Sequence, residues 1–538
     1  MDLTQRASGI VLHPTSLPGP HGIGDLGEEA HRFVDWLAGA GQRLWQVLPV
    51  NPIGPGHSPY QCPSAFAGSG LMVALRPLVD AGWLDAAALA DVPAFDSTRV
   101  DYGAVIPWRW ARLAQAAAGF FSHAGAADRA HFAAWQAAEA PWLDDWALFA
   151  ALKDEHGGQP WWAWAGPLAR RDPAALQAAR MRLTAGIAMH RFVQWCFDRQ
   201  MADLRACAKS RGVHLMGDLP IFVAHDSADV WARPDLFELG DDHQPTVVAG
   251  CPPDGYSPEG QRWGNPLYRW SRMQAEGFGW WIARLRRALA HADVLRIDHF
   301  RGFAGYWEVP AGSPTARDGR WRPAPGMALF TAIEQAFAAS HGKLPIVAED
   351  LGTITPDVIA LREHFGFPGM RIVQEAFSGD ATHDFLPHHH VPACLAYSST
   401  HDSDTALGWW QQAPAAHRAF AAEYLQAGGP GGTGDGRDVP LALIRAASRS
   451  VANLALFPLQ DVLALDGRHR LNLPGSDSGN WNWRFHWGMV DETVAPTLAR
   501  IAAVTGRAPF AVMRDTGTAA SAGLTATHER PGRSAARH

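Results

Sequence analysis

Short apolar runs rich in β-branched residues alternate along this chain with longer stretches in which apolar residues recur every three or four positions. The short runs predict buried strands and the longer stretches predict amphipathic helices. The predicted strands lie at residues 9–17, 42–50, 213–223 and 294–297, at the starts of 344–353 and 394–404, and at 369–376 and 453–463. The predicted helices lie at residues 28–40, 183–211, 280–291, 328–341, 357–365, 414–427, 441–451 and 494–505. Such alternation is typical of an α/β fold with a parallel sheet.

The number and order of these elements predict a (β/α)8 TIM barrel with long helical and loop insertions between the barrel strands. A doubly wound open sheet is the alternative fold. The sequence contains no Walker A phosphate-binding loop. A nucleotide-binding function of that type is therefore not favoured.

Carboxylates stand at the ends of three predicted strands. Asp298 follows the strand at residues 294–297, and the next two such segments end in Glu349 and in His401-Asp402. Because the carboxyl ends of parallel strands form the functional edge of such folds, three acids in equivalent places favour catalysis over unrelated surface turns. Glycoside chemistry needs two such carboxyl groups, one as nucleophile or base and one as proton donor.

The residues beside these acids also bear on their chemistry. Arg296 precedes Asp298 by two positions, so both side chains face the same side of the strand and Arg296 is expected to keep Asp298 ionised. Asp350 follows Glu349 directly and should point away from it, which predicts a structural role for Asp350.

We expect one (β/α)8 catalytic domain over residues 1–505. A mostly helical subdomain rich in alanine and tryptophan is predicted as an insertion at residues 65–181, after the second strand. A loop-rich insertion is predicted at residues 224–279, after the third strand. The tail at residues 515–538 is rich in Ala, Gly, Thr and Arg and is predicted to be disordered.

Composition excludes several classes of function. The net charge of −7 and the pI of about 6.4 provide no basic surface for nucleic acid or an anionic membrane. The five cysteines form no C-x-x-C pair, and no H-E-x-x-H segment occurs, so neither a disulfide framework nor a metal site is indicated. The N-terminal segment lacks the features of a signal peptide, so a cytoplasmic protein is expected.

Tryptophan is unusually common, with 24 residues against 7 tyrosines. Flat indole rings suit sugar rings, which have apolar faces and hydroxyl rims. Filling of the core is the alternative explanation, and it should account for most of these residues.

Taken together, these features resemble the 4-α-glucanotransferases, also called amylomaltases or disproportionating enzymes, of glycoside hydrolase family 77 in the α-amylase superfamily. The resemblance covers about residues 8–486. It is based on GIVLHPTSLPGPHGIGDLG at 9–27, SPYQ at 58–61, GDLPI at 217–221, WGNP at 263–266, RIDHFRG at 296–302, AEDLG at 348–352, THD at 400–402 and NWNWR at 480–484. Small departures occur at Ser69 and Ser399, where the family pattern has asparagine and glycine.

The resemblance implies roles for individual residues. Asp298 would be the nucleophile, Glu349 the general acid/base and Asp402 the stabiliser of the transition state. The residues expected to bind the glucan or to support this site are Ser58, Tyr60, Asp218, Asp254, Tyr256, Trp263, Arg296, His299, His401 and Asn472. Asp254, Tyr256 and Trp263 lie in the segment that resembles the family's acceptor-side lid.

The predicted function is transfer of a segment of an α-1,4-glucan to the 4-hydroxyl of an acceptor glucan or glucose by a retaining double displacement. Maltooligosaccharides and starch chains are the expected substrates, and no cofactor, metal, nucleic acid or membrane is implied. One alternative is an α-glucan hydrolase of the same superfamily. A catalytically inactive glucan-binding protein is another, which the intact set of three carboxylates disfavours.

Overall fold

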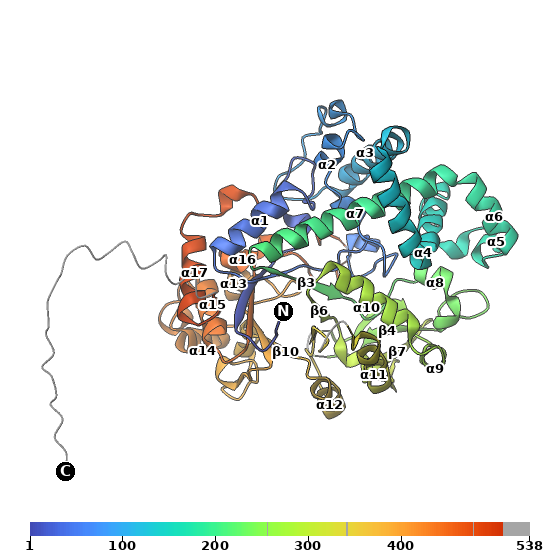
Figure 1. Ribbon diagram of the computed structural model, residues 1–538. Helices are drawn as coiled ribbons and strands as arrows, with labels where there is room; N and C mark the ends of the chain where they lie inside the picture. Colours follow the sequence, from blue (N-terminus) through green and yellow to red (C-terminus); the bar gives the residue numbers. More distant parts are fainter. Residues whose placement is uncertain (255–256, 340–342, 477, 509–538) are drawn as a thin grey trace, which may run out of the picture.

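The computed structural model describes residues 1–254, 257–339, 343–476 and 478–508. Hydrogen bonds connect its large parallel sheet in the order β10-β11-β12-β1-β2-β3-β6-β9. Across the remaining seam, Ala348 N donates to Pro368 O at 2.9 Å. Along the chain, each strand of this sheet lies beside the strand of the sheet that precedes it, and the sheet closes on itself. The predicted (β/α)8 barrel is therefore confirmed (Figure 1). The strands are β1 (Ala7–Val11), β2 (Leu44–Gln46), β3 (His214–Leu219), β6 (Val294–Ile297), β9 (Ile346–Ala348), β10 (Gly369–Ile372), β11 (Cys394–Tyr397) and β12 (Leu454–Pro458).

The barrel interior is filled with side chains. Alternate residues of the strands point inward and form one apolar cluster, as the period of two along a strand requires. This cluster contains Val11, Leu44, Met216, Val294, Val347, Met370, Ile372, Leu395, Tyr397, Leu454 and Leu456.

Several barrel strands are shorter than predicted. β1 ends at Val11 and is followed by a 3-10 turn, η1 (Pro14–Ser16), while β10 passes into the 3-10 segment η8 (Val373–Ser378). β12 passes into the short helix α16 (Leu459–Val462). The apolar residues beyond each strand are buried because they fold over the end of the barrel, and an apolar run alone does not distinguish them from a paired strand.

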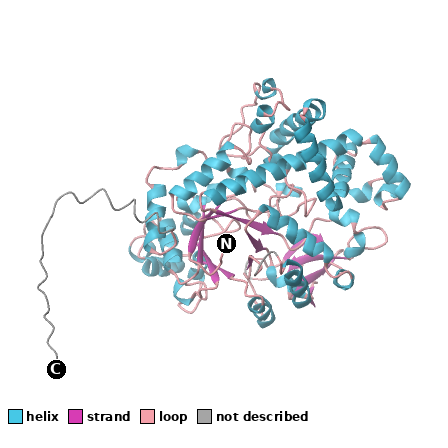
Figure 2. Cartoon of the chain, viewed as in Figure 1, coloured by secondary structure: helices cyan, strands magenta, loops and turns pink. Residues whose placement is uncertain are grey.

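Helices surround the barrel, as Figure 2 shows. In α1 the buried residues are Ala30, Phe33, Val34 and Leu37, the face that the sequence periodicity predicts. The predicted helix at 328–341 ends at Phe337, and residues 340–342 lie outside the described part of the chain. The outer helices include α1 (Glu28–Gly39), α7 (Thr184–Ser210), α10 (Gly279–His291), α11 (Gly326–Phe337), α12 (Pro356–His364), α14 (Ala415–Leu425), α15 (Val439–Arg449) and α17 (Val494–Val504).

Between β2 and α7 the chain forms five further α-helices, α2 (Arg76–Asp80), α3 (Tyr102–His123), α4 (Ala126–Glu155), α5 (Gly166–Ala169) and α6 (Pro173–Arg182). Both α3 and α4 pack on α7. Aromatic side chains fill this contact: Trp83 lies 5.1 Å from Phe120 and 5.5 Å from Trp195, measured between ring centroids. All three rings are buried, so these tryptophans serve the core.

The region predicted as loop-rich at 224–279 contains regular structure that the sequence pattern did not show. It holds α8 (Ala228–Ala232), β4 (Val247–Cys251), β5 (Gln261–Pro266) and α9 (Trp270–Ala275). β4 and β5 join β7 (Gly305–Pro310) and β8 (Arg320–Pro323) in an antiparallel sheet of order β5-β4-β7-β8. In Figure 2 it forms a second group of strands beside the barrel. β5 and β8 are partly or fully exposed and rich in Arg and Pro, so they lack the apolar alternation that identifies a strand. β4 is a mostly buried run of only five residues, VVAGC.

Among the described residues, no helix is long and apolar enough to cross a membrane. The tail predicted to be disordered, at 515–538, lies outside the described residues.

The close pairing of β1 and β2 generates a prediction about Gly9. A Cβ atom at Gly9 would meet the backbone oxygen of Leu44 at 2.3 Å, so Gly9→Ala should force the two strands apart. We expect it to lower the free energy of unfolding by about 1–3 kcal/mol. Gly39 is the exposed last residue of α1, and a Cβ atom added there would meet nothing within 4 Å. Gly39→Ala is therefore the control and should leave stability unchanged or raise it. Denaturant unfolding of both variants decides the matter, and equal stabilities would contradict the steric argument.

Candidate active site

Four carboxylates lie at one edge of the barrel, where its strands end. Asp218 is the penultimate residue of β3, Asp298 follows β6, Glu349 follows β9, and Asp402 lies in the loop after β11. Strand pairing brings them together, because Asp218 pairs with Arg296 in the β3–β6 register and Ile297 pairs with Ala348 in the β6–β9 register. Neighbouring strand ends thus carry the acids that the sequence analysis selected.

Arg296 connects two of these acids. Its Nη1 donates to both oxygens of Asp218, at 2.8 and 2.7 Å, and its Nη2 lies 3.0 Å from Oδ1 of Asp298. The Asp218 side chain is fully buried and that of Arg296 nearly so. Burial lowers the pKa of Arg296, but Asp218 and Asp298 outweigh it and hold that pKa well above its ordinary value. The guanidinium is therefore a permanent positive charge beneath the site.

Asp298 and Glu349 have different protonation equilibria. Burial raises the pKa of Asp298 to about 6 against the opposing effect of Arg296. Burial and then the nearby Asp298 raise the pKa of Glu349 to about 7, although His299 N and Leu351 N each donate to its carboxylate at 2.7 Å. Asp298 therefore ionises at a lower pH than Glu349, and between these two pKa values Asp298 is mainly ionised while Glu349 is mainly protonated.

Asp402 is held in its ionised form. Its side chain is 47% exposed, and Oδ2 lies 3.2 Å from His401 Nε2 while Oδ1 accepts a hydrogen bond from Asn472 Nδ2 at 2.6 Å. Desolvation alone would raise the pKa of Asp402, but His401 and Asn472 bring it below its ordinary value. Desolvation opposes protonation of His401, and Asp402 reverses this and raises the pKa of the imidazole. The two groups therefore stabilise each other as an ion pair.

Tyr60 links these two parts of the site. Its hydroxyl donates to Asp218 Oδ2 at 2.9 Å and lies 2.9 Å from His401 Nε2. The Tyr60 and His401 rings are stacked, with centroids 5.4 Å apart and planes 7° from parallel. Ser58 supports this arrangement, because its Oγ accepts from Tyr60 N at 3.2 Å.

His299, which directly follows Asp298, is in contact with Trp263. His299 has a left-handed backbone with φ of 48°, and its buried Nε2 has no hydrogen-bond partner among the described residues. Burial lowers the pKa of His299 to about 3, so the ring is neutral. Trp263 contacts it edge-on, with ring centroids 4.8 Å apart. Trp263 belongs to β5, not to the expected continuous loop, and its carbonyl accepts a hydrogen bond from Gln61 at 3.3 Å.

Asp254 and Tyr256 are the other two residues expected in the acceptor-side lid. Oδ1 of Asp254 accepts a hydrogen bond from Ser257 N at 2.7 Å. Tyr256, the remaining residue expected in the lid, lies outside the described residues.

The structure also identifies residues that the sequence analysis missed. Asp461, in α16, accepts hydrogen bonds from Ser398 Oγ and Ser399 Oγ at 2.6 Å each and from Ala406 N at 2.7 Å. These bonds clamp both ends of the loop that carries His401 and Asp402. The hydroxyl of Ser399, noted as a departure from the family pattern, thus has a structural role. An acid near the end of the eighth predicted strand, residues 453–463, was the available signal for Asp461, by analogy with the other three.

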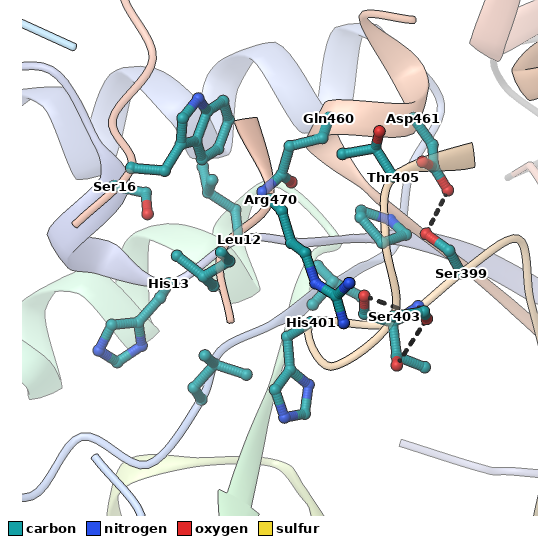
Figure 3. A pocket seen from close by; sticks show the side chains of 16 residues that line it. Leu12, His13, Ser16, Ser399, His401, Ser403, Thr405, Gln460, Asp461 and Arg470 are labelled. Carbon is teal, nitrogen blue, oxygen red and sulfur yellow. Dashed lines mark hydrogen bonds between the residues drawn. The ribbon is translucent and has the colours of Figure 1, made fainter. Parts of the chain in front are cut away.

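Figure 3 shows the cavity beside this loop, with the Ser399–Asp461 hydrogen bond on one side and His13 and His401 on the other. Arg470 extends across it, donates to the carbonyl of Asp402, and donates through Nε to the carbonyl of Asn472 at 2.6 Å. Arg470 therefore fixes the backbone of Asp402 and of Asn472, which holds the Asp402 side chain in place.

Asp350 points away from the site, as expected from its position next to Glu349. It accepts from Met370 N at 2.7 Å and lies 3.5 Å from both Arg362 and Arg371. These contacts stabilise the junction of β9 and β10.

The arrangement suits a two-step displacement at a sugar carbon. It offers an ionised carboxylate, a protonated carboxyl beside it, and a third carboxylate held ionised, surrounded by aromatic rings and polar groups. Among the described residues, no group of three or more His, Cys, Asp or Glu could hold a metal ion.

Comparison with known proteins adds independent evidence. Residues 12–491 match a family model described as 4-alpha-glucanotransferase. The chain is 49% identical to a 4-alpha-glucanotransferase of Thermus thermophilus and 44% identical to one of Synechocystis, covering 93% and 94% of this chain and 99% of each relative. Its fold matches the amylomaltase from Streptococcus agalactiae solved in complex with acarbose, with a TM-score of 0.88 and 34% identity over 94% of this chain and all of that one.

Proposed function

Since the chain belongs to the 4-alpha-glucanotransferase family, glycoside hydrolase family 77, we propose that it transfers a segment of an α-1,4-glucan to the 4-hydroxyl of an acceptor glucan or glucose. The observation that supports this most directly is the pair Asp298 and Glu349, whose pKa values differ in the sense that retaining chemistry needs. The carboxylates stand at the strand ends, where barrels of this type carry their chemistry.

In the first step of the proposed reaction, an oxygen of Asp298 attacks the anomeric carbon of the donor. The bond from that carbon to the bridging oxygen breaks, and Glu349 gives its proton to this oxygen, which leaves as the 4-hydroxyl of the released glucan. In the second step, Glu349 takes the proton of the acceptor's 4-hydroxyl, whose oxygen attacks the same carbon and releases Asp298. Two inversions retain the α configuration.

The surrounding charges support these roles. Arg296 favours the carboxylate form of Asp298 both before attack and when it leaves. The positive charge that develops on the sugar ring is stabilised by ionised Asp402, which His401 and Asn472 hold in position. Neutral His299 has a free nitrogen for a sugar hydroxyl, and Tyr60 presents a ring face beside His401.

We propose that the segment 224–279 supplies the acceptor side of the cleft. Trp263 is the described residue that supports this, because its ring borders His299, which directly follows the proposed nucleophile. A flat ring there binds a sugar acceptor and limits the access of water, and both effects favour transfer over hydrolysis.

Starch chains and maltooligosaccharides are the substrates that we propose for this site. A cytoplasmic location is also proposed, and the five free thiols support it, because thiols persist in reducing compartments.

The first test measures the products that the wild type and Asp298→Asn form from maltotriose. Maltotriose alone should produce glucose together with longer maltooligosaccharides, and Asp298→Asn should reduce turnover by several orders of magnitude because no covalent intermediate forms. Chromatography of the products measures both. Asp435→Asn changes an aspartate that is 75% exposed and should match the wild type. Glucose and maltose as the sole products would identify a hydrolase instead.

The pH dependence follows from the two catalytic carboxyls. Asp298 must be ionised, so kcat/KM should fall as the pH decreases through about 6; Glu349 must be protonated, so kcat/KM should fall as the pH increases through about 7. The profile for maltotriose should therefore be bell-shaped with a maximum between these values. Initial rates at acidic, neutral and alkaline pH values test this profile. Each pH is chosen so that the protein remains folded. A rate that continues to rise well above the pKa of Glu349 would be incompatible with Glu349 as the acid.

Trp263→Ala tests the proposed acceptor platform. The ratio of hydrolysis to transfer should increase several-fold while cleavage of the donor continues, since only the second step uses the acceptor. Free reducing ends and longer oligosaccharides, measured in one assay, report the ratio. Trp162→Ala removes a half-buried tryptophan that stacks on His225 at 3.9 Å in another part of the molecule, and should leave the ratio unchanged. If both reactions of Trp263→Ala decrease equally, Trp263 only supports the fold.

A further inference from the structure

Glu375 is a carboxyl at the mouth of the barrel that the proposed reaction does not use. It lies in η8, directly after β10, and β10 stands between the strands that precede Glu349 and Asp402. Gln374 fixes its position, because Gln374 N donates to Ser398 O at 3.1 Å and Gln374 Nε2 donates to Asp404 O at 3.2 Å. These bonds tie Glu375 to the loop that carries Asp402.

The other isolated carboxyls of this edge are satisfied by the protein. Asp461 accepts three hydrogen bonds, and Asp350 accepts one and has two arginines close by. The Glu375 side chain is half buried, yet its carboxyl makes no hydrogen bond or ion pair within the described residues; only its backbone oxygen accepts one, from Ser378 Oγ at 2.9 Å. Loss of water without a replacement partner is costly for a carboxyl and is tolerated mainly at functional sites.

The groups around Glu375 define its charge. Burial, and then the negative charge of Asp402, raise the pKa of Glu375 to about 7. The helices packed on η8 are α14 and α15. The first contacts it through Phe420 and Tyr424, which lie against Phe377. Tyr424 is engaged with His388 at 2.9 Å, and the arginines of α15, Arg445 and Arg449, are exposed. No cation of the described residues forms an ion pair with the Glu375 carboxyl.

We propose that Glu375 binds hydroxyl groups of the glucan chain, next to the sugar that Asp402 contacts. The inference rests on the proposed function and adds a substrate-binding residue to it. A carboxylate accepts two hydrogen bonds from neighbouring ring hydroxyls, and such charge-assisted bonds are stronger than neutral ones. A partly dehydrated carboxyl in a cleft for polyhydroxylated chains therefore gains on substrate binding the partners that the protein does not provide.

This role has a measurable consequence for protons. Hydroxyl donors favour the ionised carboxyl, so glucan binding should lower the pKa of Glu375 and release a proton from the fraction of molecules that carry one. Near neutral pH, glucan binding should therefore release a fraction of a proton that is attributable to Glu375, since burial raises the pKa of Glu375 to about 7. A carboxyl that does not contact the glucan would release none.

The experiment is titration calorimetry of maltotriose binding to Asp298→Asn, which binds without turnover, in buffers of different ionisation enthalpy at pH 7. Adding Glu375→Gln should remove the Glu375 share of proton release, while Glu349 and Asp402 remain present in both proteins. Adding Glu375→Ala should weaken binding by about 10-fold or more, because it removes the charge-assisted hydrogen bonds of the carboxyl. In otherwise wild-type protein the same substitution should raise KM more than it lowers kcat.

The matched control is Glu363→Gln in α12, whose side chain is 66% exposed, and it should change neither quantity. Two results would overturn the inference. One is that both Glu375 variants release as many protons and bind maltotriose as tightly as Asp298→Asn alone. The other is that they bind maltotriose more weakly but release the same number of protons. Glu375→Gln is nearly isosteric, so it keeps the test valid if Glu375→Ala unfolds. Failure of the proposed function looks different: the wild type itself would then form no longer oligosaccharides from maltotriose.

Discussion

The arrangement of the site depends on one buried cation, Arg296. A guanidinium in the interior is stable only when opposite charges accompany it, and Asp218 and Asp298 supply them. In return, Arg296 holds Asp218 as an anchor for Tyr60 and keeps a negative charge on Asp298 in surroundings that would otherwise favour its neutral form. Removing any member would leave an uncompensated charge, so the barrel edge and the candidate nucleophile depend on each other.

The carboxyl groups around the barrel mouth differ in acidity, and the charge of Arg296 contributes to this difference. Asp402 is the strongest acid because His401 and Asn472 stabilise its charge, Asp298 is intermediate, and Glu349 is the weakest because it is buried and adjoins a second negative charge. In the proposed mechanism, similar carboxyl groups thus serve as a permanent anion, a nucleophile and a proton donor. The difference arises from neighbours and burial, as the rules for pKa shifts require.

Elements outside the inner barrel hold these carboxyl groups in position. Asp461 clamps the loop after β11 through two serines and a backbone amide, and Arg470 holds the carbonyls of Asp402 and Asn472. The small antiparallel sheet presents Trp263 against His299. In the proposed mechanism, the barrel edge therefore carries the reacting groups, while inserted segments contribute contacts around them.

The barrel and its three principal carboxylates could be predicted from the amino-acid sequence, because strand and helix periodicities and acids at strand ends are local patterns that need no knowledge of contacts. Arg296 could also be assigned, since the period of two along a strand places it beside Asp298. The folded chain was needed to show where β1, β10 and β12 end, that residues 247–251 and 261–266 pair into a second sheet, and that Asp461 and Glu375 lie at the barrel mouth.

Those features depend on partners far apart in the chain. Asp461 meets Ser398 across 63 positions, and Glu375 reaches the loop of Asp402 because β10 and β11 are neighbours. Burial and the fields of distant charges exist only after folding. The protonation of each carboxyl is therefore a property of the tertiary structure, whereas the presence of the carboxyl at a strand end is a property of the sequence.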